Sequence, residues 1–324
     1  MRALALTLDL DTPSEYAAIH GVRLAAEDPH LMYRRPLTRF AELCQRIGAP
    51  GTLFVISRDL CGPASNRLGE LMAQGFEIAS HSHNHAYDLI RGDAAALTKE
   101  VRRSREALRM ELGIEVRGFR APGYAVTSAL LDVLQAESFV YDSSVMPSPP
   151  YVALKALVLT AYRLLGRACA AVPGAPEAAL APTQPYRPGE LPYVPGARPI
   201  LELPLAVATP ARLPATGAAI ILAPALLRRA MCADLQRRDI LVFNLHAMDF
   251  VDAQADGLPR SLVLRQPELR IPVARRMEIL AGFFGALVAQ RELLTCAGVA
   301  NRLQGRGAPR GHSLRVVRDE PRSS

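Results

Sequence analysis

Residues 3–13 read ALALTLDLDTP, an apolar run that ends in two spaced aspartates and a proline. The run is typical of a strand that is buried in a parallel sheet. Side chains two positions apart on a strand face the same way, so Asp9 and Asp11 are expected on one side of its carboxyl end. Two carboxylates there are costly unless a cation lies beside them. The simpler alternative is that Asp11 caps a turn ahead of Pro13 and that Asp9 pairs with an arginine.

Strand-like and helical segments alternate along the rest of the chain. Short apolar runs predict strands at 3–8, 52–56, 76–79, 116–119, 139–141, 199–203 and 240–245. Helical stretches are predicted between them, at 37–47, 64–74, 93–112, 127–137, 224–238 and 271–290. This alternation predicts an α/β fold with a parallel sheet, either open or closed into a (β/α) barrel.

The strand predicted at 76–79 is followed by SHSHNH at 80–85, which holds three of the seven histidines of the chain. His81 and His85 are four residues apart, so we expect them on one side of a helical turn, where they can bind one metal ion. A lone histidine is more often structural, but three at the end of a strand favour ligands. With a carboxylate from the first strand they form a set that suits Zn²⁺ or another divalent ion.

The segment GFRAPGY at 118–124 also follows a predicted strand. Arg120 can neutralise and orient a carboxylate there, and the N–H groups of the turn can donate to an oxyanion. An ordinary Pro-Gly turn is the simpler interpretation.

The segment FNLHAMD at 243–249 is the last candidate. His246 ends an apolar strand, and Asp249 is near enough to orient it. Without the other segments, His246 would be read as a structural histidine at the edge of the core.

The composition of the chain limits the domain organisation and the partners that we expect. The chain has 324 residues, of which 50% are hydrophobic, so it can form one large α/β domain or two small ones. The net charge is +7, but all basic residues except Lys99 and Lys155 are arginines, and only 6% of the residues are aromatic. We see no basic stripe interleaved with aromatic residues and expect no nucleic-acid partner.

The five cysteines are scattered and form no CxxC pair. They predict neither a zinc ribbon nor a disulfide framework and indicate reduced thiols in a cytoplasmic protein. The apolar run at the N-terminus is too short for a secretion signal, which also favours the cytoplasm.

Residues 146–198 break the alternation, because they contain ten prolines. We predict that they form an insertion or lid carrying an apolar helix at 151–172, within a domain that spans residues 1–300. The three basic residues of this helix make it unfavourable as a membrane span. The helix is expected either to touch the inner membrane surface peripherally or to pack on the barrel as a lid. The Arg-rich tail, 301–324, is predicted to be mobile.

The order of these segments resembles the NodB-type polysaccharide deacetylases, carbohydrate esterase family four. Residues 7–11 stand at the Asp-rich first motif of that family, and 81–85 stand at its His-Ser/Thr-x-x-His motif. Residues 120–124 stand at its Arg-x-Pro motif, and Leu245–His246 stand at its last motif. Tyr141-Asp142-Ser143-Ser144 is a weaker match that makes Asp142 a further candidate. The resemblance covers residues 3–300 except 146–198 and implies a distorted (β/α) barrel.

The resemblance also implies roles for single residues. One divalent metal ion, zinc, is expected on three ligands, Asp11, His81 and His85. Asp9 is expected to act as the general base, Arg120 as its orienting partner and His246 as the general acid.

The chain departs from the common pattern of the family in three places. Leu10 separates two aspartates that are usually adjacent, a form that resembles intracellular and lipid-linked-sugar branches. Gly123 stands where an aromatic residue often follows, so the oxyanion donor is the amide of Gly123 or of Tyr124. The chain has no tryptophan, which speaks against a long polymer-binding groove.

The function implied is the removal of an N-acetyl or N-formyl group from an amino sugar, either lipid-linked or part of a small glycoconjugate. One alternative is a mononuclear amidohydrolase that acts on a cyclic or linear amide. Dinuclear members of that class often use a lysine, and neither Lys99 nor Lys155 is predicted at the end of a strand. A non-catalytic carbohydrate-binding relative is the other alternative, but such a protein would have lost a ligand, the base or the acid.

Overall fold

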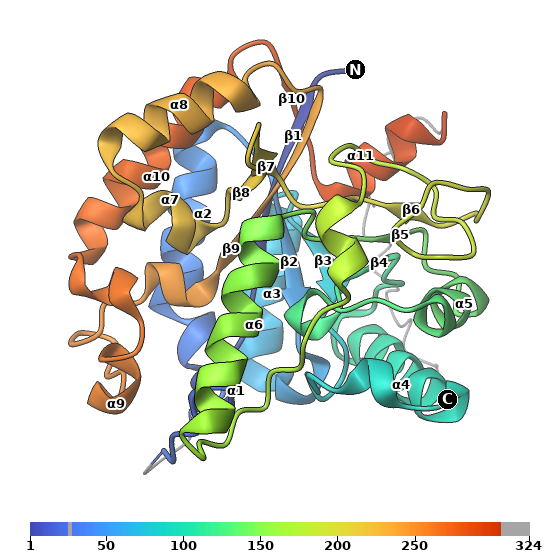
Figure 1. Ribbon diagram of the computed structural model, residues 1–324, viewed down its shortest axis with the longest axis horizontal. Coiled ribbons are helices and arrows are strands. Elements are labelled where there is room, and N and C mark those ends of the chain that lie inside the picture. Colours follow the sequence, from blue (N-terminus) through green and yellow to red (C-terminus); the bar gives the residue numbers. More distant parts are fainter. Residues whose placement is uncertain (25–27, 306–324) are drawn as a thin grey trace, which may run out of the picture.

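The computed structural model describes residues 1–24 and 28–305, and its centre is a parallel sheet (Figure 1). The other strands assemble on β1 (Ala3–Asp9), whose seven residues are all buried. On one side β9 (Ile240–His246) pairs with β1 along its whole length. On the other side β2 (Gly51–Val55) pairs with residues 6–9 and β10 (Glu292–Leu293) with residues 3–4. The apolar stretch that opens the sequence is therefore the central strand.

The sheet continues beyond β2 through four strands in chain order, all of them parallel. They are β3 (Glu77–Ser80), β4 (Gly118–Phe119), β5 (Tyr141–Asp142) and β6 (Leu201–Glu202). After β6 the backbone N–H of Ala206 donates to the carbonyl of Val242 on β9, at 2.8 Å, so the chain bridges the gap between the two edges of the sheet. The sheet is a curled half-barrel, which confirms the predicted α/β fold and distorted (β/α) barrel.

Helices cover the outside of the sheet (Figure 1). The structure contains the predicted helices as α2 (Arg35–Ile47), α3 (Gly62–Ala73), α4 (Ala94–Leu112), α5 (Ser128–Ala136), α8 (Ala225–Leu235) and α10 (Val273–Val288). Their ends follow local chemistry, as α4 illustrates. The Asp93 side chain accepts the N–H of Ala96 at its start, and Gly113 ends it with a φ of 67°.

Other short elements were not anticipated from the sequence, because each is too short to show a clear periodicity. They are the helices α1 (Pro13–His20), α7 (Gly217–Leu222), α9 (Arg260–Val263) and α11 (Cys296–Leu303), and the antiparallel pair β7 (Val207–Ala208) and β8 (Leu213–Pro214). Short 3-10 helices are η1 (Leu31–Tyr33), η2 (Ser57–Asp59), η3 (Leu89–Arg91), η4 (Pro122–Tyr124), η5 (Pro176–Leu180), η6 (Ala247–Phe250) and η7 (Pro267–Arg270).

The apolar helix predicted at 151–172 is shorter than expected. It is α6 (Pro149–Leu164), which starts at the Ser148 side-chain cap. Gly166 follows it with a φ of 62°, a left-handed conformation that ends a helix, and residues 167–172 have no regular structure. In the part of the chain that the structure describes, no helix has the length and apolar character needed to span a membrane.

The division into a domain of residues 1–300 with an insertion at 146–198 stays a prediction. Most of the tail predicted to be mobile, residues 306–324, lies outside the described residues.

Strand β4 passes so close to β5 that only glycine fits at one position. Gly118 pairs in register with Tyr141, and a Cβ atom there would lie 2.0 Å from Cζ of the tyrosine ring. Tyr141 is fully buried, and its hydroxyl donates to Oε1 of Glu77 at 2.7 Å. The ring therefore has no room to withdraw.

We predict that Gly118→Ala lowers the free energy of unfolding by about 1–3 kcal/mol, because the added methyl group overpacks the sheet against Tyr141. The measurement is equilibrium denaturation of the full chain. Gly69→Ala is the control, because Gly69 is exposed on α3 and no atom lies within 4 Å of its added Cβ. We expect this control to raise the free energy of unfolding by about 0.5–1 kcal/mol, since alanine favours a helix interior. Equal effects of the two substitutions would contradict the packing described.

Candidate active site

The carboxyl ends of the parallel strands meet at one end of the curled sheet. Asp9 ends β1, His81 follows β3, Arg120 follows β4 and His246 ends β9. Parallel strands place such positions at a common edge, which is where barrel enzymes carry their sites. The four residues are far apart in the sequence and lie together for this reason.

Asp11, His81 and His85 form a candidate metal centre. Oδ1 of Asp11 lies 3.2 Å from Nε2 of His81 and 3.3 Å from Nε2 of His85, and the two Nε2 atoms are 3.2 Å apart. Three donors at these separations surround a point about 2 Å from each, the usual length of a Zn–N or Zn–O bond. Within residues 1–24 and 28–305 no other set of three such side chains converges in this way. The donor set fits a divalent metal ion.

The histidines of the triad hold Asp11 in the ionised form that metal binding requires. Burial alone would raise the pKa of Asp11, but His85 and His81 outweigh it and hold the pKa well below its ordinary value. Burial would lower the pKa of His81, and the neighbouring Asp9 and Asp11 raise it instead. Asp11 is therefore an ionised carboxylate, as a metal ligand must be.

The loop at 81–85 is not the helical turn that the sequence predicts. Ser82 and His85 both have positive φ values, 64° and 54°, so the two histidines converge through a tight irregular loop. The N–H of His85 donates to Oγ of Ser82 at 3.0 Å. Glu100 of α4 accepts the N–H of His83 at 2.9 Å and the side-chain amide of Asn84 at 2.7 Å. These bonds replace those that a helical turn would make.

The three histidines of the loop have different surroundings. Nδ1 of His81 lies 2.7 Å from the carbonyl of Arg120, which orients the ring and leaves Nε2 toward the triad. His83 lies outside the triad, and its Nδ1 is 2.8 Å from Oγ of Ser57. Nδ1 of His85 is buried and makes no hydrogen bond with any residue that the structure describes.

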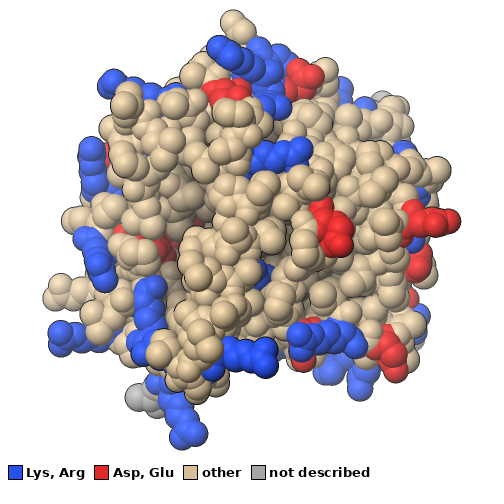
Figure 2. Space-filling view, viewed as in Figure 1, with Lys and Arg blue, Asp and Glu red and all other residues tan. Residues whose placement is uncertain are grey.

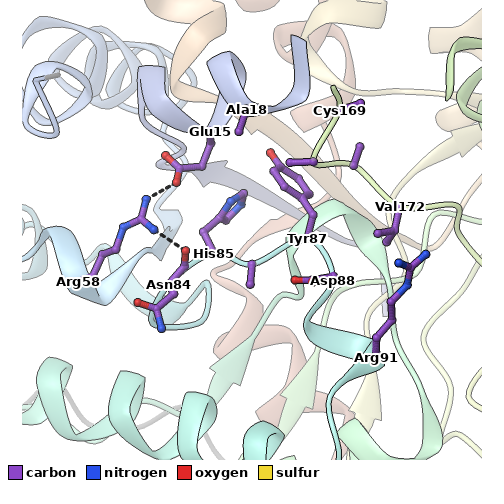
Figure 3. A pocket seen from close by; sticks show the side chains of 13 residues that line it. Glu15, Ala18, Arg58, Asn84, His85, Tyr87, Asp88, Arg91, Cys169 and Val172 are labelled. Carbon is purple, nitrogen blue, oxygen red and sulfur yellow. Dashed lines mark hydrogen bonds and ion pairs between the residues drawn. The ribbon is translucent and has the colours of Figure 1, made fainter. Parts of the chain in front are cut away.

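A pocket of about 520 Å³ borders the histidine loop on the side of α1 (Figure 3). Arg58 donates there to the carboxylate of Glu15 on α1 and, at 2.6 Å, to the carbonyl of Asn84 (Figure 3). The loop is thus held by Glu100 and by Arg58, which connects it to α1.

Arg120 and Asp9 form a buried ion pair beside the triad. Nη1 of Arg120 donates to Oδ1 of Asp9 at 2.6 Å and to Oγ1 of Thr7 at 2.7 Å. Its Nε and Nη2 donate to the carbonyl and the hydroxyl of Ser143, at 2.8 and 2.9 Å. The guanidinium also lies over the ring of Phe54, 3.9 Å from its centre. These contacts fix Arg120 completely.

The second oxygen of Asp9 faces the rest of the site. Oδ2 accepts a hydrogen bond from Nδ2 of Asn244 at 2.7 Å. It also lies 3.9 Å from Nε2 of His81 and 3.7 Å from Nε2 of His246. Asp9 therefore stands between the candidate metal centre and His246.

His246 is the most accessible of these side chains, with 24% of its surface exposed. Its Nε2 is 3.2 Å from the hydroxyl of Tyr124, which also donates to Oδ1 of Asn244 at 2.8 Å. The carboxylate of Asp249 contacts the backbone of His246, because its Oδ2 accepts the N–H of His246 at 2.9 Å. Asp249 therefore fixes the end of β9.

The sequence left two backbone amides as candidate oxyanion donors, and the structure distinguishes between them. The N–H of Tyr124 donates to the carbonyl of Ala121 at 3.2 Å, which leaves the amide of Gly123 as the candidate. Both residues line the pocket that contains Asp9 and His246.

Asp142 does not line that pocket. It is fully buried, its Oδ1 accepts the hydroxyl of Ser144 at 2.6 Å, and burial raises its pKa. It lies beside Glu202 of β6, whose pKa burial and Asp142 also raise. Asp142 is therefore not a residue of the active-site pocket.

The pocket above the triad has a volume of about 360 Å³. Its floor carries Asp9, Asp11, His81 and His246, and apolar and tyrosine side chains of α6 form one wall. The molecular surface is hollowed beside α6 on the face shown in Figure 2, and most of the Lys and Arg side chains lie toward the outline of that face.

Several residues that hold the site were not predicted from the sequence. Thr7 and Asn244 each precede a named site residue by two positions on a strand, so alternation could have predicted them. Glu100 and Ser143 carry no such signal, because only the packing of α4 and the end of β5 brings them near.

Comparisons with known proteins bear on the family and the fold of the chain. A model of the polysaccharide deacetylase family matches residues 32–141, which include the histidine loop and Arg120. A search of curated proteins gives no match. The chain is similar in structure to a protein from Mycobacterium smegmatis described as a polysaccharide deacetylase, with 17% identity, 94% of this chain and 92% of the other covered, and a TM-score of 0.55. It is also similar to PuuE allantoinase, with 14% identity, coverages of 94% and 90%, and a TM-score of 0.54.

At these identities the two structures show a shared fold and nothing further. The family match confirms the resemblance read from the motifs and, with it, the prediction of a deacetylase, a hydrolase.

We predict that His81→Ala and His85→Ala each remove most of the bound metal, because each deletes one of three ligands. His83→Ala is the matched control in the same loop and should retain the metal, since its ring contacts Ser57. The measurement is elemental analysis of zinc-loaded protein after gel filtration. Loss of the metal from His83→Ala with retention in His85→Ala would contradict the ligand set.

Proposed function

We propose that this member of the polysaccharide deacetylase family removes an N-acetyl or N-formyl group from an amino sugar with the help of one zinc ion. The observation that carries the proposal is the convergence of three metal-ligand atoms, two of whose residues line one pocket together with a buried carboxylate and an accessible imidazole. Amide hydrolysis needs this combination, because it requires an activated water, a base and an acid for the leaving amine.

The residues divide the chemistry among them. A divalent ion on the triad supplies polarisation of the amide carbonyl and a lower pKa for a bound water. Asp9 would accept the proton of the attacking water at Oδ2, while Arg120 holds the carboxylate in place through Oδ1. The amide of Gly123 donates to the developing oxyanion. His246, the accessible imidazole, donates a proton to the departing amine.

The proposed substrate is a lipid-linked amino sugar at the cytoplasmic face of the membrane. The pocket is small, and beside it α6 exposes the apolar side chains of Leu154 and Leu157. Arg163 and Arg167 lie at the end of the same segment. An apolar face with flanking arginines suits the surface of an anionic bilayer. A small soluble glycoconjugate is the alternative substrate.

A second candidate reaction is hydrolysis of a cyclic amide. It is favoured by one observation, the shared fold with a structure named as an allantoinase. Allantoin therefore belongs in the substrate panel, where it separates the two reactions.

We predict that zinc-loaded wild-type protein releases acetate or formate from N-acylated amino sugars, and that Asp9→Asn lowers kcat about 10²–10⁴-fold while zinc stays bound. The base is lost in this variant, but the three ligands remain. The panel contains a lipid-linked sugar in anionic liposomes, its water-soluble counterpart and allantoin. Turnover of allantoin alone, or an Asp9→Asn variant as active as wild type, would refute the proposed reaction.

We predict that His246→Ala lowers kcat and removes the alkaline limb of the pH–rate profile, because that limb reports loss of the acid's proton. The measurement is kcat against pH for the zinc-loaded variant and wild type. An alkaline limb that persists unchanged in His246→Ala would show that another group protonates the amine.

A further inference from the structure

We propose that Lys155 binds a phosphate group of the substrate while the acyl amide lies between Asp9 and His246. This inference rests on the proposed function and adds a specificity-determining residue to it. Lys155 is one of only two lysines in the chain. Its position on α6 places it beside the active site, which its position in the sequence did not indicate.

Helix α6 brings Lys155 over the active site. The helix crosses in front of the sheet in Figure 1, and Tyr151, Lys155 and Leu159, spaced four residues apart, all line the pocket. The ring of Tyr151 lies 5.7 Å from that of Tyr124, which contacts His246. The lysine thus belongs to the same wall that borders the proposed acid.

The ammonium group of Lys155 has no counter-ion in the structure. Its Nζ donates to the carbonyl of Gly123 at 3.0 Å, and no carboxylate lies within 4 Å of it among the described residues. Its neighbours Leu154 and Val158 are apolar, and burial lowers its pKa. A half-buried cation without an anion is unfavourable and gains from an anionic ligand.

Two of the other charged groups of the pocket are matched, whereas Asp249 and Glu268 also line it and form no ion pair among the described residues. Asp9 pairs with Arg120, and Asp11 faces the two histidines. Among the described residues that line the pocket, Lys155 is the only lysine or arginine, and it is the cation available to a ligand. A lysine is a compact charge without the planar fork that binds carboxylates in two places, and it serves as a phosphate binder in many sites.

Lys155 also borders free volume outside the main pocket. It lines a separate cavity of about 160 Å³, together with Gly123, Tyr151 and Met146. A substrate that reaches from the triad to Lys155 therefore has room for a tetrahedral group. The phosphate can be that of a soluble sugar phosphate or that of a sugar joined to a lipid, and both present the same chemistry to the ammonium.

The first test compares kcat/KM for N-acetylglucosamine 1-phosphate with that for neutral N-acetylglucosamine. We expect wild type to prefer the phosphate and Lys155→Met to reduce this ratio about 10- to 100-fold, the equivalent of one charge-assisted hydrogen bond. Lys155→Arg should restore part of the ratio. Lys99→Met is the matched control, because Lys99 is exposed on α4, and it should leave the ratio unchanged. A lipid-linked sugar phosphate in neutral liposomes separates the two sources of the phosphate.

A structural role for Lys155 gives a different result. If the lysine only holds the carbonyl of Gly123, Lys155→Met lowers kcat/KM equally for both substrates and the ratio does not change. Such an outcome, or a wild type without preference for the phosphate, would overturn the inference.

The second test does not depend on turnover. Because the chain has only two lysines, ¹³C-dimethylation gives two lysine signals, and Lys155→Met identifies one of them. In zinc-loaded Asp9→Asn, the pKa of Lys155 should rise on addition of the sugar phosphate and not of the neutral sugar. If wild type hydrolyses neither substrate, the proposed function fails, and this titration still decides whether Lys155 binds the phosphate.

Discussion

The ion pair between Arg120 and Asp9 is the interaction on which the rest of the site depends. Both side chains are buried, and they join the carboxyl end of β4 to that of β1 across the curl of the sheet. Transfer of two charges from water is costly unless every donor finds a partner, and Thr7 and Ser143 take the remaining bonds of the guanidinium. Removal of one partner from such a pair costs about 3–5 kcal/mol. The pair therefore ties the position of the Asp9 carboxylate to the packing of the sheet.

The pair also explains why the two aspartates of the first motif differ. Asp9 is matched by Arg120, whereas Asp11 faces only imidazoles, at 3.2 and 3.3 Å. Two imidazoles and a carboxylate that converge on one point are best compensated by a divalent cation. The carboxylate with its own arginine is then free to accept protons, and the one beside the histidines is free to bind metal. One strand thus supplies two carboxylates with separate roles.

The sequence predicts this arrangement in part. The apolar run of β1 and the period of two along it indicated a buried strand with Asp9 and Asp11 at its end. The histidines were predicted as ligands, but the conformation of their loop was not, because it has two positive φ values and is held by Glu100 from a distant helix. The early end of α6 and the position of Lys155 over the pocket were also not predicted, since both depend on how the segment packs on the sheet. Local patterns indicated the strands and the residue types, but only tertiary contacts determine how they converge.

The most direct test of the central claim is the position of the metal. Crystals grown with zinc and measured on both sides of the zinc absorption edge give an anomalous difference map. We predict one strong peak about 2 Å from Oδ1 of Asp11 and from Nε2 of His81 and of His85. Asp9 should remain bound to Arg120 in the same crystals. A peak at any other site, or a metal bound directly by Asp9 in place of Asp11, would contradict the division of roles between the two aspartates.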